Sequence, residues 1–266
     1  MADPGGAGAR RIADAFARRS GTAALMPYLM AGFPTVEGAA HIGRAYVEER
    51  ADLVELGLPF SDPLADGPVI HAAGTRALAN GTSLDDALAL CEGLAPDLPV
   101  VVMGYVNLVL ARGAQVFASA LADAGASGLI VPDLPLEEND EVLAACDGAG
   151  LALVPLVAPT SPPERLEAIG RRARGFVYAV SVIGTTGERT SLADHVGPLL
   201  ERVKGASPVP VALGFGISTP GQAAAAADAG ADGVIVASRL MRAAADAADP
   251  AAAVAPLVRG FRQALG

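Results

Sequence analysis

Short apolar runs alternate with longer amphipathic segments along the whole of this 266-residue chain. Each run is nearly continuous in apolar residues, which predicts a strand buried on both faces, as in a parallel sheet. The amphipathic segments between the runs predict helices, so the alternation is typical of the α/β class. Eight such runs are present, at residues 24–30, 52–57, 99–105, 128–133, 152–158, 175–181, 209–216 and 233–238.

Several of the predicted helices begin with recognisable capping residues. Residues 161–164 (SPPE) and 219–222 (TPGQ) each combine an N-cap hydroxyl, a proline at the first helical position and a Glu or Gln at the third. Residues 83–86 and 191–194 begin with serine and end with aspartate, a weaker version of this pattern. We expect an additional helix around residues 11–19 to cover the bottom of the fold.

Two α/β architectures accommodate these strands, a (β/α)8 barrel and an open doubly wound sheet. The GxGxxG fingerprint of dinucleotide-binding doubly wound sheets is absent after the first run. The last two runs are instead followed by GFGIST and ASRL, where barrels commonly bind phosphate. The sequence therefore favours a single (β/α)8 TIM barrel domain over residues 1–266, since no linker-like segment divides it.

Composition excludes several classes of function. Hydrophobic residues make up 52% of the chain, but no run approaches the roughly 18 apolar residues of a membrane span, and the N-terminus lacks the apolar segment of a secretory signal. We therefore expect a cytoplasmic protein without a membrane partner. The net charge of −10 comes without a basic cluster, which argues against a nucleic-acid partner. Cys91 and Cys146 lack a CxxC motif and are interpreted as buried thiols.

The segments after the last two strands predict a site for a small phosphate ester. Gly214 and Gly216 would let backbone amides approach an anion closely, while Ala237 and Ser238 open the next helix with outward N–H groups. The alternative is that the glycines only form a tight turn. Because the two segments converge in a barrel, the phosphate interpretation is favoured.

An ionisable residue, Glu55, interrupts the second apolar run, where it is costly unless paired or used. Asp62 and Asp66 follow on the loop at the carboxyl end of that strand, the face from which barrels draw catalytic residues. A strand carboxylate and a loop carboxylate are predicted to act as an acid/base pair with different pKa values. The alternatives are a structurally satisfied carboxylate at Glu55 and a turn former beside Pro63 at Asp62.

The scarcity of other catalytic side chains narrows the chemistry. The only lysine, Lys204, falls on a predicted helix, which argues against a Schiff-base aldolase. The three histidines, His41, His71 and His195, fall in separate helical segments, which argues against a metal site. Acid/base chemistry by carboxylates remains, helped by a phenol for which Tyr178 is best placed; a core tyrosine is the alternative.

Residues 182–192 (VIGTTGERTSL) are longer and more polar than the other links between strands and helices. They are interpreted as a lid whose closure excludes water and brings Thr186 to Asp66. An ordinary mobile loop is the alternative.

The chain closely resembles the tryptophan synthase α subunit family. The motifs that carry the resemblance are, in the family's order, PYLMAGFP, ELGLPFSDPLADGP, MGYVNLV, VPDLP, YAVSVIGTTG and GFGIS, of which the second is highly specific. The resemblance implies a barrel and the retro-aldol cleavage of indole-3-glycerol phosphate to indole and glyceraldehyde 3-phosphate, in the last steps of L-tryptophan biosynthesis. It implies no cofactor or metal for this chain, since the indole ring serves as the electron sink.

The resemblance also implies roles for individual residues. Glu55 matches the general acid/base that protonates indole C3 and takes the proton from the glycerol hydroxyl. Asp66 matches the group that hydrogen-bonds the indole N–H, and Tyr178 matches a tyrosine near Glu55. The positions implied to bind substrate are Tyr28, Ile70, Ile130 and Phe215 around the indole, Gly187, Gly216, Ala237 and Ser238 around the phosphate, and Thr186 on the lid.

A partner is implied as well. The family's α subunit forms an αββα complex with a β subunit that carries pyridoxal phosphate and receives the indole. Pro59, Asp62 and Asn107 lie on segments that match the β-contacting loops. Free α subunits are poorly active, consistent with a lid that closes when the partner docks.

The chain departs from the family's pattern at three places. Met30 stands where many members have Thr, Ala237 replaces a frequent Gly, and the lid reads GTTG where GVTG is commoner. None of these touches the expected acid and base. Two other hypotheses are a stand-alone lyase that releases free indole, and a subunit that only activates its partner. Intact Glu55 and Asp66 argue against the second.

Overall fold

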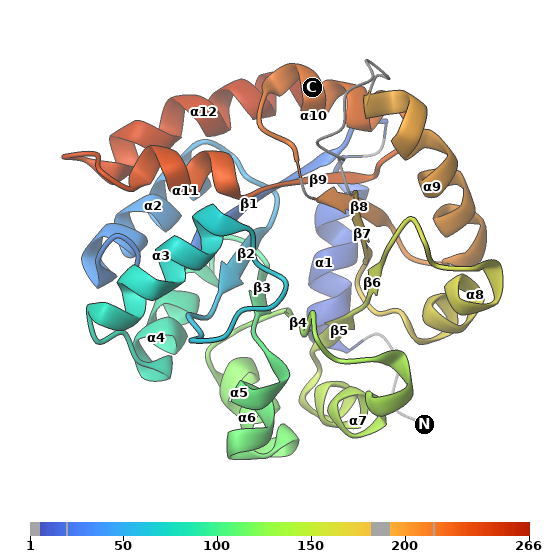
Figure 1. Cartoon of the computed structure of the whole chain (residues 1–266), viewed down its shortest axis with the longest axis horizontal. Coiled ribbons are helices and arrows are strands. Elements are labelled where there is room, and N and C mark those ends of the chain that lie inside the picture. Colours follow the sequence, from blue (N-terminus) through green and yellow to red (C-terminus); the bar gives the residue numbers. More distant parts are fainter. Residues whose placement is uncertain (1–5, 20, 182–191, 215) are drawn as a thin grey trace.

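The computed structural model describes residues 6–19, 21–181, 192–214 and 216–266, and Figure 1 shows its strands at the centre with helices around them. The strands in the described part of the chain are β1 (Ala24–Met30), β2 (Val54–Gly57), β3 (Val100–Met103), β4 (Gly128–Ile130), β5 (Ala152–Val154), β6 (Leu156–Val157), β7 (Val177–Val180), β8 (Val211–Gly214) and β9 (Gly233–Val236). All neighbouring strands are parallel, in the order β5-β4-β3-β2-β1-β9-β8-β7-β6.

The predicted (β/α)8 barrel is confirmed, with one departure in the strand pattern. The run at residues 152–158 yields two short strands, β5 paired with β4 and β6 paired with β7. Pro155 separates them because a proline has no N–H to donate to a sheet. Its carbonyl oxygen still accepts a hydrogen bond from the Tyr178 N–H at 2.9 Å. The barrel therefore closes through a broken fifth strand.

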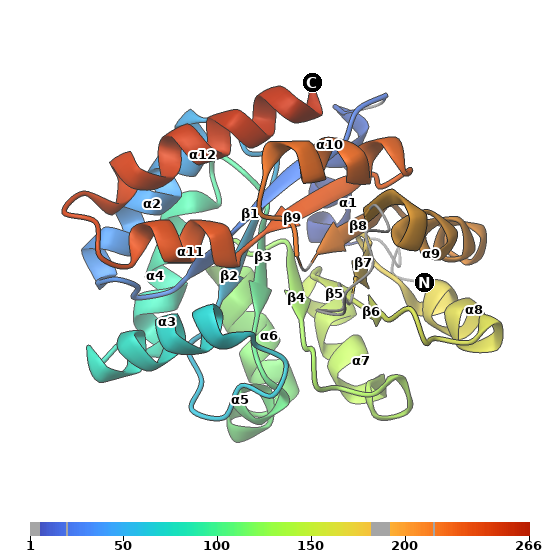
Figure 2. The ribbon, with the colours of Figure 1, turned by 45° about the horizontal axis from the view of Figure 1, so that its top comes forward.

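The helices form an outer ring, which the tilted view in Figure 2 also shows. Those described are α1 (Ala7–Ala17), α2 (Val36–Glu48), α3 (Pro68–Ala79), α4 (Leu84–Leu94), α5 (Val106–Arg112), α6 (Ala114–Asp123), the 3-10 helix η1 (Leu136–Glu138), α7 (Asp140–Ala149), α8 (Pro163–Arg172), α9 (Leu192–Ala206), α10 (Pro220–Asp228), α11 (Ser238–Ala244) and α12 (Pro250–Leu265). None of the described helices is long and apolar enough to cross a membrane.

Two of the predicted helix starts are confirmed and one is wrong. Residues 83–86 and 219–222 both form complete capping boxes, at the starts of α4 and α10. Ser161 does not cap α8, because Pro163 holds Pro162 in an extended conformation and the helix begins one residue later than expected. The Ser161 hydroxyl accepts a hydrogen bond from the Ala158 N–H instead. The serine at position 191 lies outside the described residues.

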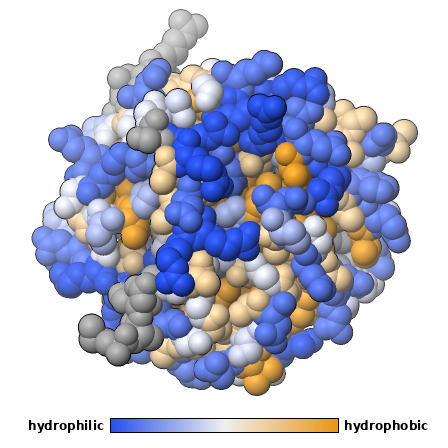
Figure 3. All heavy atoms as spheres, turned by 180° about the vertical axis from the view of Figure 1, so that it is seen from behind, coloured by the Kyte–Doolittle hydropathy of each residue, from blue (hydrophilic) through white to orange (hydrophobic). Residues whose placement is uncertain are grey.

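Helix α1 covers the bottom of the barrel, as predicted, although it begins at Ala7. Its Ile12 and Phe16 belong to the same buried cluster as Leu53 and Phe176. The rings of Phe16 and Phe176 have centroids 5.7 Å apart. From behind, the molecule shows hydrophilic residues between small, separate hydrophobic patches (Figure 3).

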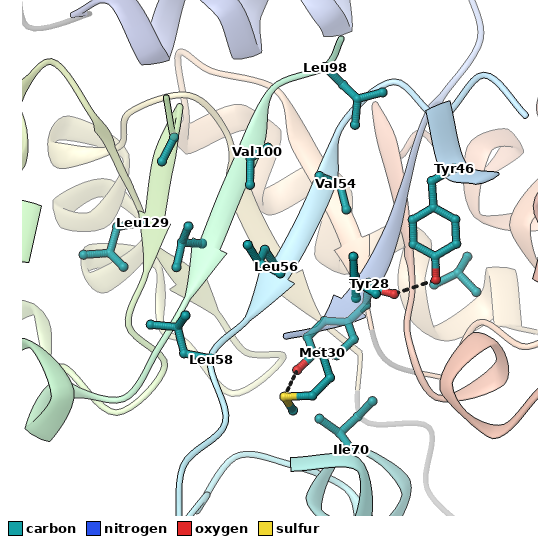
Figure 4. Close-up of a cluster of buried hydrophobic side chains, with 14 of the residues drawn as sticks. Tyr28, Met30, Tyr46, Val54, Leu56, Leu58, Ile70, Leu98, Val100 and Leu129 are labelled. Atoms are coloured by element: carbon teal, nitrogen blue, oxygen red, sulfur yellow. Dashed lines mark hydrogen bonds between the residues drawn. The ribbon is translucent and has the colours of Figure 1, made fainter. Parts of the chain in front are cut away.

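A second buried cluster joins the outer faces of the strands to the helices. Figure 4 shows part of it, where Val54, Leu56 and Val100 project from β2 and β3. Tyr46 on α2 donates a hydrogen bond to the Tyr28 carbonyl oxygen at 2.9 Å, which ties this helix to β1. The positions of the strands, and hence of the side chains at their carboxyl ends, are fixed by this packing.

Candidate active site

A cavity of about 300 Å³ lies at the carboxyl ends of the barrel strands. Of the residues predicted for catalysis and substrate binding, all that the structure describes line this cavity: Tyr28, Glu55, Asp66, Ile70, Ile130, Tyr178, Gly216, Ala237 and Ser238. Thr186, Gly187 and Phe215 lie outside the described residues, as do residues 182–191 of the predicted lid at 182–192. Parallel strands end at the same edge, so residues far apart in the sequence converge here.

One oxygen of the buried Glu55 lacks, among the described residues, the partners that a structural carboxylate has. Asp52, three residues earlier, is also buried, with 6% of its surface exposed. It accepts hydrogen bonds from Arg19 and Arg262, both at 2.6 Å, and from the Leu25 N–H at 2.8 Å. Glu55 is 2% exposed, and its Oε2 has no hydrogen-bond partner among the described residues. A buried acceptor left unpaired is costly, which favours a functional role for Glu55.

The surroundings of Glu55 stabilise its protonated form. Burial, and secondarily the charge of Asp66, raise the pKa of Glu55 from 4.5 to about 8. A carboxyl group with this pKa is mostly neutral at pH 7 and acts as a proton donor. Asp66 is only partly buried, whereas Glu55 is 2% exposed, so the two carboxyl groups lie in different environments.

Asp66, on the loop between β2 and α3, lies beside Tyr105. Burial raises the pKa of Asp66, while a hydrogen bond from Tyr105 and the nearby His71 oppose that rise. The Tyr105 hydroxyl also accepts a hydrogen bond from the Ala65 N–H at 3.1 Å, and its ring stacks on Phe60 at 5.2 Å between centroids. Tyr105 therefore fixes the loop that carries Asp66.

Two other tyrosines face the carboxyl groups. Burial raises the pKa of Tyr28 and Tyr178 well above 10, and the charges of Glu55 and Asp66 add to both shifts. Glycines make room for their hydroxyl groups: a Cβ at Gly57 would lie 1.9 Å from the Tyr28 hydroxyl oxygen, and a Cβ at Gly214 would lie 2.3 Å from that of Tyr178. Gly214 thus serves the packing of a tyrosine.

Met30, one of the departures from the family's pattern, supports this wall without lining the cavity. The Tyr28 hydroxyl approaches the Met30 sulfur at 3.8 Å, as Figure 4 shows beside Ile70. Met30 is itself fully buried. Met30 therefore affects the site through the orientation of Tyr28.

The opposite part of the cavity has the features predicted for a phosphate site. Gly216 adopts a positive φ of 81°, a conformation that favours glycine. It lines the cavity together with Ser218, Ala237 and Ser238. The two segments that follow β8 and β9 are thus brought together, and they offer hydroxyl and backbone groups to an anion.

The sequence patterns did not identify several residues that line the cavity. These are Ala65, Gly67, Met103, Pro132, Leu156, Ile217, Ser218, Ile235, Arg239 and Arg242. Tyr105 was missed as well, although a tyrosine at the end of the apolar run 99–105 was a signal for it. A more open cavity of about 450 Å³ lies beyond Pro132 and Leu156, beside α8. Its one carboxylate, Asp133, accepts a hydrogen bond from the Val106 N–H at the start of α5.

The lysine considered for Schiff-base chemistry lies away from the cavity. Lys204 on α9 pairs with Asp232 at 2.7 Å, near the amino end of β9 and so away from the cavity. Within the described ranges, no three His, Cys, Asp or Glu side chains form a group that could hold a metal. The two cysteines are free and buried.

The residues predicted for a partner interface lie on neighbouring segments. Pro59 lines a small cavity with Leu108 of α5, the helix that also carries Asn107. Asn107 and Asp62 are exposed, and Leu64 on the same loop is 88% exposed. This surface adjoins the catalytic loop, since Phe60 stacks on Tyr105.

Comparison with known proteins gives a consistent result. A family model described as tryptophan synthase alpha chain matches residues 15–263. The tryptophan synthase alpha chain of Gloeobacter violaceus is 50% identical over 250 residues, covering 93% of this chain and 90% of that one. That of Synechococcus elongatus is 46% identical over 258 residues, covering 96% of each.

Solved structures agree with these relatives. A structure of Mycobacterium tuberculosis tryptophan synthase matches with a TM-score of 0.88 and 39% identity, covering 96% of this chain and 98% of that one. Tryptophan synthase subunit alpha from Legionella pneumophila matches with a TM-score of 0.88 and 36% identity, over 96% of this chain and 98% of that one.

Proposed function

The chain belongs to the tryptophan synthase alpha chain family, and we propose how its cavity carries out the family's reaction. That reaction is the retro-aldol cleavage of indole-3-glycerol phosphate to indole and glyceraldehyde 3-phosphate, in the biosynthesis of tryptophan. The observation that carries the proposal is the buried Glu55 carboxyl group, which keeps its proton at neutral pH and has an unpartnered oxygen.

Glu55 moves both protons of the reaction. The neutral carboxyl group donates its proton to C3 of the indole, and the ring becomes a cation with the positive charge centred on its nitrogen. The resulting carboxylate removes the proton from the glycerol hydroxyl next to the scissile bond. A carbonyl forms there, the carbon–carbon bond breaks, and its electron pair returns to the ring. Glu55 ends in its starting state, with no net proton consumed.

Asp66 stabilises the cation formed in between. Its carboxylate accepts a hydrogen bond from the indole N–H, whose charge increases when C3 is protonated. Tyr105 holds Asp66 in place through the hydrogen bond already described. Tyr28, Ile70 and Ile130 provide the walls against which the indole ring packs.

The phosphate occupies the other part of the cavity. Gly216, Ala237 and Ser238 offer it backbone and hydroxyl groups, and Gly187 is assigned the same role by family membership. The phosphate is remote from the bond to be cleaved, and its binding positions that bond near Glu55. Tyr178, whose pKa responds to Glu55, orients that carboxyl group.

The partner is a tryptophan synthase β subunit in an αββα complex. The surface around Pro59, Asp62 and Asn107 is its docking site, and the exposed Leu64 adds an apolar contact. Because Phe60 stacks on Tyr105, docking on this loop acts on Asp66 through Tyr105. Pyridoxal phosphate belongs to the β subunit, and this chain needs no cofactor of its own. Two free thiols suit a reducing cytoplasm.

Steady-state cleavage of indole-3-glycerol phosphate by the purified chain, with and without a β subunit, tests the proposal. We expect slow turnover that the β subunit strongly stimulates, and loss of turnover in Glu55→Gln. Fast turnover of the chain alone would indicate a stand-alone lyase, and no turnover in either condition would indicate an inactive partner subunit. Retained turnover in Glu55→Gln would refute the role of Glu55.

A further inference from the structure

The cavity described above is lined by acidic side chains from one part of the barrel and by basic side chains from another. Glu55 and Asp66 come from β2 and the loop that follows it, whereas Arg239 and Arg242 come from α11. Both arginines line the cavity together with Ser238, the first residue of α11. The proposed substrate has a matching polarity, with a neutral indole at one end and a phosphate dianion at the other.

The geometry of α11 places these three residues on one edge of the helix. Ser238 and Arg242 are separated by four positions and Arg239 and Arg242 by three, spacings that put side chains on one side of a helix. The buried face of the same helix consists of Leu240, Met241 and Ala244, so packing fixes which edge meets the cavity.

The guanidinium groups of Arg239 and Arg242 form no hydrogen bond or ion pair with any described residue. The neighbouring Arg76, by contrast, donates a hydrogen bond to the Ala245 carbonyl oxygen at 2.5 Å and lies over the Phe33 ring. Arg239 is partly buried and Arg242 is exposed. Two cations at the wall of a cavity, without a side-chain partner among the described residues, are available to bind an anion.

We propose that Arg239 and Arg242 are phosphate-binding residues of this enzyme, which add a charged contact to the hydroxyl and backbone groups around Gly216 and Ser238. Guanidinium groups bind phosphate oxygens in pairs of parallel hydrogen bonds, which gives orientation as well as affinity. The inference rests on the proposed function, since it takes the same phosphate ester as its ligand.

The phosphate lies away from the bond that breaks, so its contacts act mainly on substrate binding. We expect their loss to raise KM more than it lowers kcat. For the double variant Arg239→Gln with Arg242→Gln we expect KM for indole-3-glycerol phosphate to rise about tenfold, the effect of losing about one charged hydrogen bond. A variant with lysine at both positions keeps the charge and is expected to recover part of the loss.

Equilibrium binding separates this inference from the proposed function, because it requires no turnover. Glycerol 3-phosphate and indole are titrated separately into the complete chain, the double glutamine variant and a control. The control, Arg18→Gln with Arg171→Gln, removes two charges away from the cavity, at the C-cap of α1 and on α8. We expect the double variant to bind glycerol 3-phosphate about tenfold more weakly, and indole as the wild type does.

An affinity for glycerol 3-phosphate within about twofold of the wild type in the double variant would overturn the inference. So would an equal loss of affinity for indole, an equal loss in the control, or the absence of saturable glycerol 3-phosphate binding to the wild type. Failure of the proposed function would appear differently, as no cleavage of indole-3-glycerol phosphate by the wild type with its β subunit.

Discussion

The buried proton of Glu55 has a consequence for stability that can be measured without substrate. The folded chain raises the pKa of Glu55 from 4.5 to about 8, whereas the unfolded chain leaves it near 4.5. Between these values the folded state binds more protons than the unfolded state, so the free energy of unfolding falls as the pH rises. The contribution of Glu55 is fully present below about pH 4.5 and is lost as the pH passes 8.

Glu55→Gln removes this titration and keeps the shape of the side chain. One pKa unit corresponds to about 1.4 kcal/mol, so the wild type is expected to lose about 3 kcal/mol relative to the variant between pH 5 and pH 8. The variant therefore gains relative stability with rising pH, although it loses lyase activity. Asp66→Asn in the wild-type background should reduce the effect, since the charge of Asp66 contributes to the shift.

Urea unfolding of both proteins at several pH values between 5 and 8 measures this difference directly. Other groups titrate alike in the two proteins and cancel in the comparison. Glu201→Gln is the matched control, because it makes the same substitution at an exposed position on α9. A difference in unfolding free energy that stays constant within about 1 kcal/mol over this range would show that Glu55 ionises like an exposed acid. It would then lack a proton to donate at neutral pH, and the proposed mechanism would fail.

Three further predictions concern activity and packing. The value of kcat/KM should fall as the pH rises through about 8, because Glu55 must carry a proton in the free enzyme, and a flat profile across that range would contradict this assignment. Tyr105→Phe should lower kcat/KM about tenfold, since Asp66 loses a hydrogen bond, and an unchanged rate in steady-state assays would remove Tyr105 from the site. Gly57→Ala should destabilise the fold by about 1–3 kcal/mol in urea unfolding, because the new Cβ would lie 1.9 Å from the Tyr28 hydroxyl oxygen; wild-type stability would mean that this ring moves freely.

The sequence by itself determined the architecture and the acid at its centre. Strand and helix periodicity are local properties of a chain, so the alternation identified the α/β class. The segments GFGIST and ASRL after the last two runs then favoured the barrel over a doubly wound sheet. Glu55 was recognisable because an ionisable residue in an apolar strand is costly wherever that strand lies. Short capping patterns were predictable at residues 83–86 and 219–222, because they involve neighbours only.

Tertiary structure decided what depends on distant segments. The broken fifth strand and the later start of α8 are exceptions, since Pro155 and Pro163 restrict the backbone locally. Arg242 became visible as a site residue only when barrel closure brought α11 to the same cavity as Glu55. Tyr105 became a site residue because the fold places it beside Asp66. Sequence spacing carries no information on such contacts, because the register of the parallel strands and the packing of the outer helices fix them.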